Sequence, residues 1–549
     1  MSPPVPSPAT RPGPRRAVGG PLMSDIRRIQ TVLESNGLPL SRRDLLRLAG
    51  ASGVSLAGLA LWAGADPVPA AAQPGGTMRI NMATDIQQLD PHLVTAWNDY
   101  CPWESVFSSL TALDRDFQPV PDLATSWTQP DPKTYVFALR KGVLFHNGRE
   151  MKAADVKFSY ERIQGLGGKS KWYTLLLDMD KVDVLDDYRV RVALKQPSAP
   201  FLANLAFAMV VAKENVEKIG VEPIGTGPFR FIERVPNSHL LVRKWEKFYV
   251  PGQPKVDEIR WVPTVEPSTR VANLKTNTVD IISEVPFESL ADLRATPGIA
   301  IQEPKASSAY AVILIKHAPP LDNKKLRQAL AMLVDREALH RVVYYGVGTT
   351  EQGCNPFPVG HWAHADVNCP KYDPDAAKKL LAEAGHPNGI ELEWKVIGTR
   401  PDTIKVAEVS KETFRKGGVT LKLVQLEFAT WVQQVYRDKQ FQLGQTIFLR
   451  EADPDGLVVS ALFTGGQNNP GGYSTKDMDT LLTQGRGELS LEKRKAIYRK
   501  IAEIVADDVP FIRLQPQPFL WASTAKVGGF YVNSQSRPFV ALREMTLGK

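Results

Sequence analysis

The segment 390–426 constrains the fold of this chain more than any other part of its sequence. Ile390 to Val396 and Leu421 to Leu426 have the composition of strands, and Ile404 to Phe414 between them has helical spacing. A strand, a helix and a strand in this order predict a βαβ unit, in which the strands are parallel and the crossover is right-handed. Strands and helices are interleaved elsewhere as well. The predicted fold class is therefore α/β, and a chain of 549 residues needs more than one sheet.

Other segments have periodicities that predict individual elements. Tyr135 to Leu139 is β-rich, and Val182–Leu185 and Tyr188–Leu194 alternate around a turn, which predicts a strand and a hairpin. Tyr310 to Ile315 is a continuous apolar run, as expected of a strand that is buried on both faces. Helical spacing predicts three further helices, namely Ala153–Ile163, Leu326–Val343 and Asp375–Ala384.

The first 72 residues have the organisation of an export signal. Residues 1–22 carry seven prolines and no hydrophobic period, so we expect them to be disordered, and translation starts at the first or the second methionine. Arg42-Arg43 resembles the twin-arginine (Tat) motif, because 18 uncharged residues, Leu48 to Ala65, and then small residues follow it. We expect cleavage near Ala72. A retained membrane anchor is the alternative, since 18 residues can just span a bilayer.

The charge balance argues against nucleic acid as a partner. The chain has 67 Lys and Arg against 59 Asp and Glu, which gives a net charge of +8. Eight of the basic and four of the acidic residues lie within 1–72, so the remaining 477 residues carry only +4, spread along their length. Proteins that bind nucleic acid gather basic residues on one face. The mature chain is instead predicted to be a nearly neutral globular protein.

The sequence carries no recognisable catalytic motif. Gly165–Ser170 resembles a phosphate loop, but the Walker spacing requires a glycine where Ile163 stands. Asp453 and Asp455 could perform acid–base chemistry, although Asp-Pro-Asp is also an ordinary turn. We therefore predict a protein that is not an enzyme and that has neither a cofactor nor a resident metal.

The three cysteines allow at most one internal disulfide. In an exported protein, Cys354 and Cys369 favour a disulfide that closes a proline-rich loop. Free thiols are one alternative, and a zinc site that includes His361 and His364 is another, although the spacings fit no known zinc signature. Cys101 is left over, and we expect it to be buried.

Motifs along the predicted mature chain resemble one protein family. The most specific are Val120-Pro121-Asp122-Leu123-Ala124, Tyr135-Val136-Phe137-Ala138-Leu139-Arg140-Lys141-Gly142, Ala153-Ala154-Asp155-Val156, Gly225-Thr226-Gly227-Pro228-Phe229, Leu326-Arg327-Gln328-Ala329-Leu330 and Asp508-Val509-Pro510-Phe511-Ile512. They resemble the bacterial extracellular solute-binding proteins of family 5, which serve peptide- and nickel-type ABC importers. Dipeptide- and oligopeptide-binding proteins are relatives in this family. The resemblance extends over roughly Gly76 to Val540.

This resemblance implies a two-lobed periplasmic-binding-protein fold of the type II-like, cluster C kind. The implied boundaries are 76–116, 222–306 and 517–549 for the sheet part of lobe I, 117–221 for an extra subdomain of lobe I, and 307–516 for lobe II. A hinge is expected where the chain crosses between the lobes, near Pro304–Tyr310 and Gln515–Trp521.

The resemblance also points to charged residues that would hold a solute. In the dipeptide-binding relatives an Arg-Pro-Tyr segment after a strand grips the peptide carboxylate, and here Arg400-Pro401-Asp402 matches it except for the tyrosine. The relatives' amine-binding aspartate matches Arg450 without a gap, or Asp453 with a gap of two or three residues. Arg400 and Arg450 together would favour a carboxylate-bearing solute. A solvated loop arginine is the alternative for Arg400.

Aromatic side chains would complete the predicted site, because solute clefts stack the apolar parts of ligands on rings. The four aromatic residues that we expect to contact the solute are Trp97, Tyr100, Trp103 and Trp431. Core packing is the alternative for each of them.

The predicted function is that of an exported, monomeric receptor that has no lipid anchor and works in the periplasm. It would trap a peptide or a related small organic solute between closing lobes and deliver it to the permease and ATPase subunits of an ABC importer, after export by the Tat translocase. A Tat-exported periplasmic hydrolase or metal-dependent enzyme is the alternative. A receptor that feeds a signalling partner is a third reading.

Overall fold

The structure is a computed structural model. It describes residues 75–94, 97–114, 118–303, 309–348, 350, 353–449, 453–517, 519–532 and 541–548. The predicted export signal within residues 1–72 lies outside these residues. No helix in these ranges is both long enough and apolar enough to cross a membrane.

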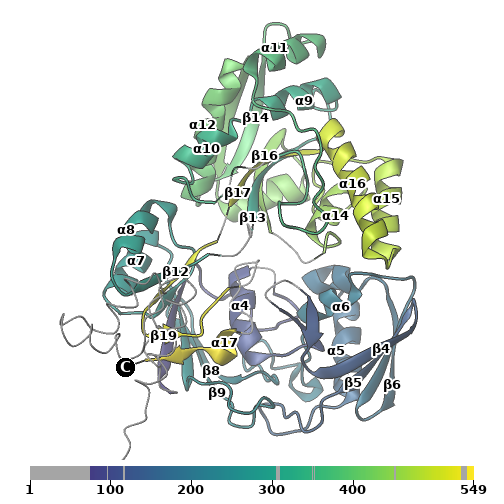
Figure 1. Ribbon diagram of the computed structural model, residues 1–549, viewed down its shortest axis with the longest axis vertical. Helices are drawn as coiled ribbons and strands as arrows, with labels where there is room; N and C mark the ends of the chain where they lie inside the picture. The colour runs from purple at the N-terminus through teal and green to yellow at the C-terminus, as the bar shows by residue number, and fades with distance from the viewer. Residues whose placement is uncertain are drawn as a thin grey trace, which may run out of the picture. The chain divides into compact units, whose positions relative to one another are not determined.

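Two sheets organise the part of the chain that we call lobe I, which comprises the described residues of 75–303 and 519–548 (Figure 1). The larger sheet has seven strands in the order β12-β18-β11-β1-β10-β9-β8, and its strand β1 pairs in parallel with both β10 and β11. The smaller sheet has four antiparallel strands in the order β4-β5-β7-β6. The predicted strand at 135–139 and the predicted hairpin belong to this smaller sheet, so both are confirmed.

The strands of these two sheets are β1 Thr77–Met82, β4 Ala124–Asp131, β5 Thr134–Leu139, β6 Met179–Asp186, β7 Arg189–Leu194, β8 Phe229–Val235, β9 His239–Lys244, β10 Glu258–Pro263, β11 Ile281–Ile282, β12 Ile299–Gln302 and β18 Trp521–Thr524. The helices of lobe I are α4 Trp97–Val106, α5 Ala153–Leu166, α6 Phe201–Asn204, α7 Pro267–Lys275, α8 Leu290–Ala295 and α17 Ala541–Glu544. Lobe I also contains two short strand pairs. One consists of β2 Thr111–Leu113 and β3 Pro119–Pro121, and the other of β19 Val527–Gly528 and β20 Thr546–Leu547.

One five-stranded sheet organises the part that we call lobe II, the described residues of 309–517. Its strands are β13 Ala309–Ile315, β14 Ile390–Ile397, β15 Val419–Leu426, β16 Leu443–Leu449 and β17 Phe511–Gln517, in the order β15-β14-β16-β13-β17. The helices of lobe II are α9 Lys324–Met332, α10 Arg336–Val342, α11 Pro374–Glu383, α12 Pro401–Lys416, α13 Phe428–Trp431, α14 Leu457–Leu462, α15 Lys476–Gly487 and α16 Leu491–Asp508.

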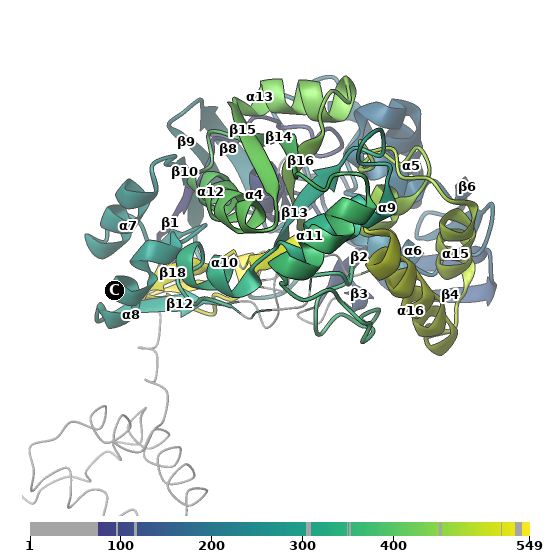
Figure 2. The same cartoon turned by 90° about the horizontal axis from the view of Figure 1, so that it is seen from above.

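The predicted βαβ unit is present in lobe II. Strands β14 and β15 pair in parallel along their full lengths, and α12 connects them and packs against both (Figure 2). The helix ends at Lys416, and at the next residue, Gly417, an added Cβ would lie 2.1 Å from a methyl carbon of Leu333, so a larger residue there would require the Leu333 side chain to move. Strands and helices alternate along the chain in both lobes, and the predicted α/β class is therefore confirmed.

Strand β13 is buried on both faces, as its apolar run predicts. Ala311, Ile313 and Ile315 belong to the core on one face of the sheet. Tyr310, Val312 and Leu314 belong to a second core on the other face. Alternation of side chains along a strand accounts for this division, and it places helices on both faces of the sheet.

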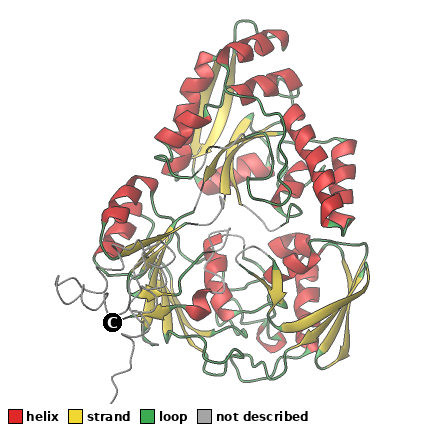
Figure 3. Ribbon diagram, in the orientation of Figure 1, coloured by secondary structure: helices red, strands yellow, loops and turns green. Residues whose placement is uncertain are grey.

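The single helix predicted from Leu326 to Val343 is wrong, because the structure contains two helices there (Figure 3). Helix α9 ends at Met332, and α10 begins at Arg336. The carboxylate of Asp335 accepts a hydrogen bond from the backbone nitrogen of Ala338 over 2.9 Å and so caps the second helix. Capping of this kind starts a new helix although the apolar spacing continues through the break.

The chain passes twice between the two lobes. It leaves the large sheet of lobe I after β12 and enters lobe II at β13, and it returns from β17 to β18. The predicted crossings near 304–310 and 515–521 fall partly on residues outside the described ranges, since 304–308 and 518 are not among them. The hinge and the exact lobe boundaries therefore stay predictions.

Removal of the bond between Cys354 and Cys369 gives the first test. The structure joins these residues in a disulfide that spans 15 positions. Replacing both with alanine should lower the free energy of unfolding by about 3 kcal/mol, because the open loop gains entropy in the unfolded chain. Urea unfolding of the oxidised protein, the reduced protein and the variant measures this. A variant as stable as the oxidised protein would contradict it.

Candidate functional site

Arg400 lies where β14 ends and α12 begins, and it is the residue that immediately precedes the helix. Its Nε and Nη2 atoms donate hydrogen bonds to the two carboxylate oxygens of Asp402 over 3.2 and 3.0 Å. Asp402 lies in the first turn of the helix, where the positive end of the helix dipole favours a carboxylate. About a third of the Arg400 side chain, 34%, is exposed. Arg400 is therefore an ion-paired residue at a helix terminus.

A carboxylate from lobe I also acts on Arg400. Burial by itself lowers the pKa of Arg400, but the negative charges of Asp402 and Glu284 raise it above its ordinary value. Glu284 follows β11, and its φ of 48° lies in the left-handed region that non-glycine residues seldom adopt. Its carbonyl oxygen accepts a hydrogen bond from the buried Arg270 over 3.1 Å. The backbone at Glu284 is thus held in an unusual conformation beside Arg400.

Tyr344 and Phe287 extend this contact between the lobes. The ring of Tyr344, in lobe II, meets the ring of Phe287, in lobe I, edge to face with 5.5 Å between centroids. The phenol of Tyr344 is buried, and among the described residues it has no hydrogen-bond partner. Burial, followed by the negative charge of Asp402, raises the pKa of Tyr344. We call Glu284, Phe287, Tyr344, Arg400 and Asp402 the Arg400 junction.

A second charged contact between the lobes is centred on Arg486, near the end of α15. Its Nε lies 2.7 Å from a carboxylate oxygen of Asp178 in lobe I and 3.2 Å from one of Asp455 in lobe II. The carbonyl oxygen of Arg486 also accepts a hydrogen bond from the backbone nitrogen of Ala199 in lobe I over 3.0 Å. Arg486 therefore links the lobes through both its side chain and its backbone.

Asp453, one of the residues predicted to hold the solute, is engaged inside lobe II. Both of its carboxylate oxygens accept hydrogen bonds from Arg494, over 2.6 and 2.8 Å. The guanidinium of Arg494 lies 4.6 Å from the ring centroid of Trp362, and only 6% of its side chain is exposed. Arg450, the other residue predicted at this position, lies outside the described residues.

The predicted aromatic contacts lie mostly in hydrophobic cores. Trp103 is fully buried and donates its indole hydrogen bond to the carbonyl of Gln88 over 2.8 Å. Trp431 is buried too and donates to the carbonyl of Lys395 over 3.2 Å. Trp97 opens α4, and its side chain lies outside the described part of the chain. For Trp103 and Trp431 the structure shows core packing, so a role in solute binding stays a prediction.

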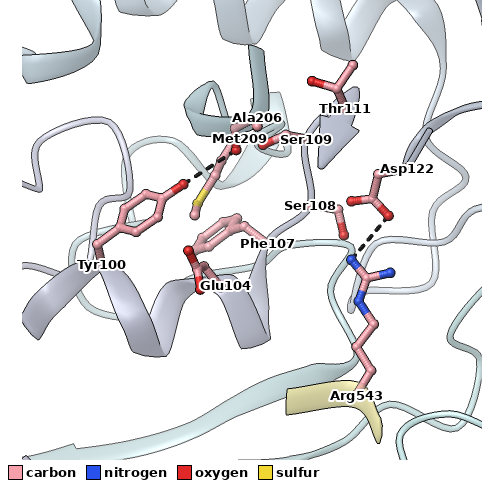
Figure 4. Close-up of a pocket in the computed structure, with 10 residues that line it drawn as sticks. All are labelled: Tyr100, Glu104, Phe107, Ser108, Ser109, Thr111, Asp122, Ala206, Met209 and Arg543. Atoms are coloured by element: carbon pink, nitrogen blue, oxygen red, sulfur yellow. Dashed lines mark hydrogen bonds and ion pairs between the residues drawn. The ribbon is translucent and has the colours of Figure 1, made fainter. Parts of the chain in front are cut away.

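Tyr100 lines a small pocket in lobe I together with Glu104, on the same helix α4, and Phe107, which directly follows that helix (Figure 4). Its hydroxyl donates to the carbonyl of Ala206 over 3.4 Å. At the other side of the pocket Arg543 lies 3.2 Å from Asp122. The free volume is about 20 Å³, which is room for about one water molecule. The pocket in this form is too small for a solute.

The residues of the alternative zinc site serve other contacts. Cys354 and Cys369 form the disulfide, the Nδ1 atom of His361 accepts from the backbone nitrogen of Ala363, and His364 contacts the carbonyl of Phe357. No group of three or more His, Cys, Asp or Glu side chains suited to a metal ion occurs in the part of the chain that the structure describes. The third cysteine, Cys101, is buried.

Sequence reasoning missed Glu284, Asp178 and Arg486. Asp178 and Arg486 are 308 positions apart, and no local pattern reveals that they meet. The pair of Arg400 and Asp402 could have been expected, because the two side chains are two residues apart at a predicted helix start. That spacing is the one available signal.

Comparison with known proteins identifies the family. Residues 118–470, more than half of the chain, match the bacterial extracellular solute-binding proteins, family 5 (middle region). The chain belongs to this family. A glutathione-binding protein, GsiB of Pectobacterium atrosepticum, is 28% identical over 501 residues, which cover 88% of this chain and 95% of GsiB.

Solved structures agree with this family. The periplasmic binding protein DppA of Helicobacter pylori, solved in complex with the peptide STSA, is 25% identical and superposes with a TM-score of 0.77 over 87% of this chain and 99% of DppA. NikZ of Campylobacter jejuni, solved with Ni(L-His), has a TM-score of 0.76 at 24% identity over 86% of this chain and 99% of NikZ, a likeness of fold alone. The predicted family and the periplasmic-binding-protein fold are confirmed, and this family 5 member is a binding protein rather than an enzyme.

Breaking the pair of Asp453 and Arg494 should destabilise lobe II. Asp453→Ala leaves the buried guanidinium without its carboxylate, which should cost about 3–5 kcal/mol of unfolding free energy. The double variant Asp453→Ala/Arg494→Met should recover much of this loss, because it removes the unpaired charge as well. Urea unfolding of the three proteins tests this. Equal stability of the single and double variants would contradict a paired role.

Asp455 should make stability depend on pH. Burial raises its pKa from the ordinary 3.8 to about 6. The folded protein therefore binds this proton more tightly than the unfolded chain does. The contribution of Asp455 to the free energy of unfolding is fully present below about pH 4 and is lost as the pH rises through 6. Asp455→Asn should gain about 3 kcal/mol relative to the wild type between pH 4 and 7.5.

Thermal unfolding across this pH range measures the difference between Asp455→Asn and the wild type. Asp375→Asn is the matched control, because Asp375 is 90% exposed. A difference for Asp455→Asn that does not vary with pH would show that its carboxyl titrates normally.

Proposed function

We propose that this protein is an exported receptor that traps a peptide or a peptide-like organic solute and delivers it to an ABC importer. The observation that carries the proposal is the Arg400 junction, where the ring of Tyr344 in lobe II contacts that of Phe287 in lobe I and the charge of Glu284 in lobe I acts on Arg400. Polar groups from both lobes at one point are what a receptor that encloses its ligand requires. Membership of family 5 supports the same function.

Closure of the lobes is the mechanism we propose for trapping the solute. Two chain crossings join the lobes, after β12 and after β17, and hinges consist of a few residues at the ends of such elements. The contacts of Arg486 with Asp178 and Ala199 would hold the closed form on one side. The Arg400 junction would hold it on the other. The contact of Arg486 is polar, and the Arg400 junction adds one pair of rings, Tyr344 and Phe287, to its charged groups.

The solute class is proposed from relatives and from Arg400. GsiB is named for glutathione, and the DppA structure contains a four-residue peptide. Arg400 keeps one nitrogen, Nη1, that has no hydrogen-bond partner among the described residues, and it is available to a solute oxygen. Arg450, Asp453, Trp97, Tyr100, Trp103 and Trp431 remain proposed contacts of the same solute.

The route to the site of action is also part of the proposal. We propose export by the twin-arginine route, cleavage near Ala72, and work in the periplasm as a monomer without a cofactor. Arg42-Arg43 and the uncharged run that follows support this proposal. The permease and the ATPase would be separate chains that receive the solute.

The test is native mass spectrometry of the protein purified from the compartment to which it is exported. We expect a small solute that is retained by the folded protein and is released intact, with no turnover. Arg400→Gln should weaken binding of that solute by about 10- to 100-fold, the loss expected for a hydrogen bond from a charged donor.

Arg415→Gln is the matched control for Arg400→Gln. Arg415 lies on the same helix, pairs with Glu412 and has 68% of its side chain exposed, so its loss should leave binding unchanged. Hydrolysis of the retained solute would refute a receptor in favour of an enzyme. Equal binding by the wild type and Arg400→Gln would remove Arg400 from the site.

A further inference from the structure

Arg486 lies between two carboxylates that come from different lobes. Its Nε atom donates a hydrogen bond to Asp178 of lobe I over 2.7 Å, and the same nitrogen lies 3.2 Å from Oδ1 of Asp455 in lobe II. One N–H bond points in one direction, so it can bond well with only one of two acceptors. Asp178 holds that hydrogen bond, and Oδ1 of Asp455 accepts none from any described residue. The two carboxylates therefore compete for Arg486.

All three of these side chains are shielded from water. The exposed fraction of the side chain is 1% for Asp455, 8% for Asp178 and 17% for Arg486. The second carboxylate oxygen of Asp178 accepts a hydrogen bond from the uncharged amide of Gln196 over 2.9 Å. Charges interact more strongly when little water lies between them. A charge on Asp455 therefore acts strongly on both Arg486 and Asp178.

Other titratable groups face Asp455 from its own lobe. Asp453, two residues before it, accepts hydrogen bonds from Arg494 of α16 on both of its oxygens. Tyr498 lies one turn further along α16, and its phenol stays protonated because burial raises its pKa. The charges with the largest effects on Asp455 are those of Arg486, Asp453, Asp178 and Arg494. Asp178 is the member of this group that belongs to lobe I.

Opening of the lobes would remove only one of the two carboxylates from Arg486. Asp178 would leave with lobe I, whereas Asp455 and Arg486 both belong to lobe II. The Nη2 atom of Arg486 is buried and has no hydrogen-bond partner among the described residues, so the guanidinium has a second donor with which to bond Asp455. In the open form an ionised Asp455 gains this pairing and loses a neighbouring negative charge. An ionised Asp455 therefore favours opening, and a protonated Asp455 favours closure.

We propose that closure of the lobes is coupled to the uptake of one proton by Asp455, which leaves Arg486 to Asp178. This inference rests on the receptor function proposed above, and it adds regulation by pH to the closing step. The proton comes from the solvent and binds to a carboxylate oxygen of Asp455. Burial raises the pKa of Asp455 to about 6, and the charge of Asp178 contributes to the rise. Because the closed form binds the proton more tightly than the open form, closure strengthens as the pH falls through 6 and weakens as it rises.

The experiment measures closure without any solute, by single-molecule energy transfer between dyes on the two lobes. Arg189→Cys on β7 of lobe I and Glu492→Cys on α16 of lobe II supply the attachment sites, because these side chains are 60% and 80% exposed. Strand β7 pairs with β6, which directly follows Asp178, and α16 packs against α15, which carries Arg486. Cys101 is buried and the other two cysteines form the disulfide, so the introduced thiols react selectively.

The measured quantity is the ratio of closed to open molecules. In the wild type we expect this ratio to rise about three- to tenfold between about pH 8 and pH 5, because one neighbouring charge changes the proton affinity of a carboxylate by such a factor or more. Asp455→Asn imitates the protonated residue, so its ratio should be high at both pH values. Asp178→Asn keeps the size of the side chain but removes the attraction to Arg486, so its ratio should be low at both.

Two matched controls remove a carboxylate elsewhere. Asp183→Asn is the control for Asp178→Asn, because Asp183 lies on β6 and pairs with Arg191 inside lobe I over 2.8 Å. Asp375→Asn is the control for Asp455→Asn, because Asp375 belongs to lobe II and is 90% exposed. Both controls should keep the pH dependence of the wild type.

The outcomes separate this inference from the function on which it rests. A wild-type ratio that does not change with pH would overturn the inference, and so would an Asp455→Asn protein that keeps the wild-type pH dependence. Titration with glutathione as the probe then tests the receptor. If glutathione raises the closed ratio but pH does not, the receptor stands without the coupling to a proton. If pH acts through Asp455 and glutathione has no effect at either pH, the coupling stands and the proposed peptide-like ligand loses support.

Discussion

The parallel pairing of β14 with β15 is the constraint on which the arrangement of lobe II depends. Parallel strands cannot be joined by a tight turn, so the chain has to cross over the sheet, and α12 is that crossover. The helix starts at the carboxyl end of β14, which places Arg400 and the positive end of the helix dipole at the same edge of the sheet. Ligands of open α/β sheets bind at this edge. The position of Arg400 is therefore a consequence of strand direction.

The contacts between the lobes follow a different principle, since they are formed by charges that lie far apart in the sequence. Asp178 reaches Arg486, and Glu284 acts on Arg400. The pair of Arg486 and Asp178 is mostly buried, and the free energy needed to take two charges out of water offsets much of their attraction. Such pairs hold the lobes in register at a small free-energy difference. That is the balance that a hinged receptor needs, because a ligand can only shift an equilibrium by its own differential affinity.

The elements with a clear period could be predicted from the sequence. The βαβ unit at 390–426, the hairpin at 182–194 and the doubly buried β13 all have local patterns of period 3.6 or 2, or continuous apolar runs. The break between α9 and α10 could not, because the cap at Asp335 interrupts an apolar spacing that continues across it. Local chemistry there competes with periodicity, and the cap decides the structure.

The site was less predictable for a related reason. The resemblance located Arg400, but whether its charge is available depends on neighbours that come from two lobes. Likewise, whether Trp103 and Trp431 face a solute or a core is set by packing, and both indoles donate to backbone carbonyls inside cores. From the sequence alone, such an aromatic residue is compatible with solute contact and with core packing. Only the partners that it contacts in the folded protein distinguish the two.

The Arg400 junction combines a pair within one lobe with contacts between the two lobes. Arg400 and Asp402 belong to the same lobe, so their pair exists whether or not the lobes meet, whereas Glu284 adds its charge only when lobe I is present beside them. In the proposed receptor, Glu284 would therefore act on Arg400 only in the closed form. The ring contact between Phe287 and Tyr344 would form and break together with it, because the two rings also come from different lobes. The junction would thus respond to closure while the pair of Arg400 and Asp402 stays in place within lobe II.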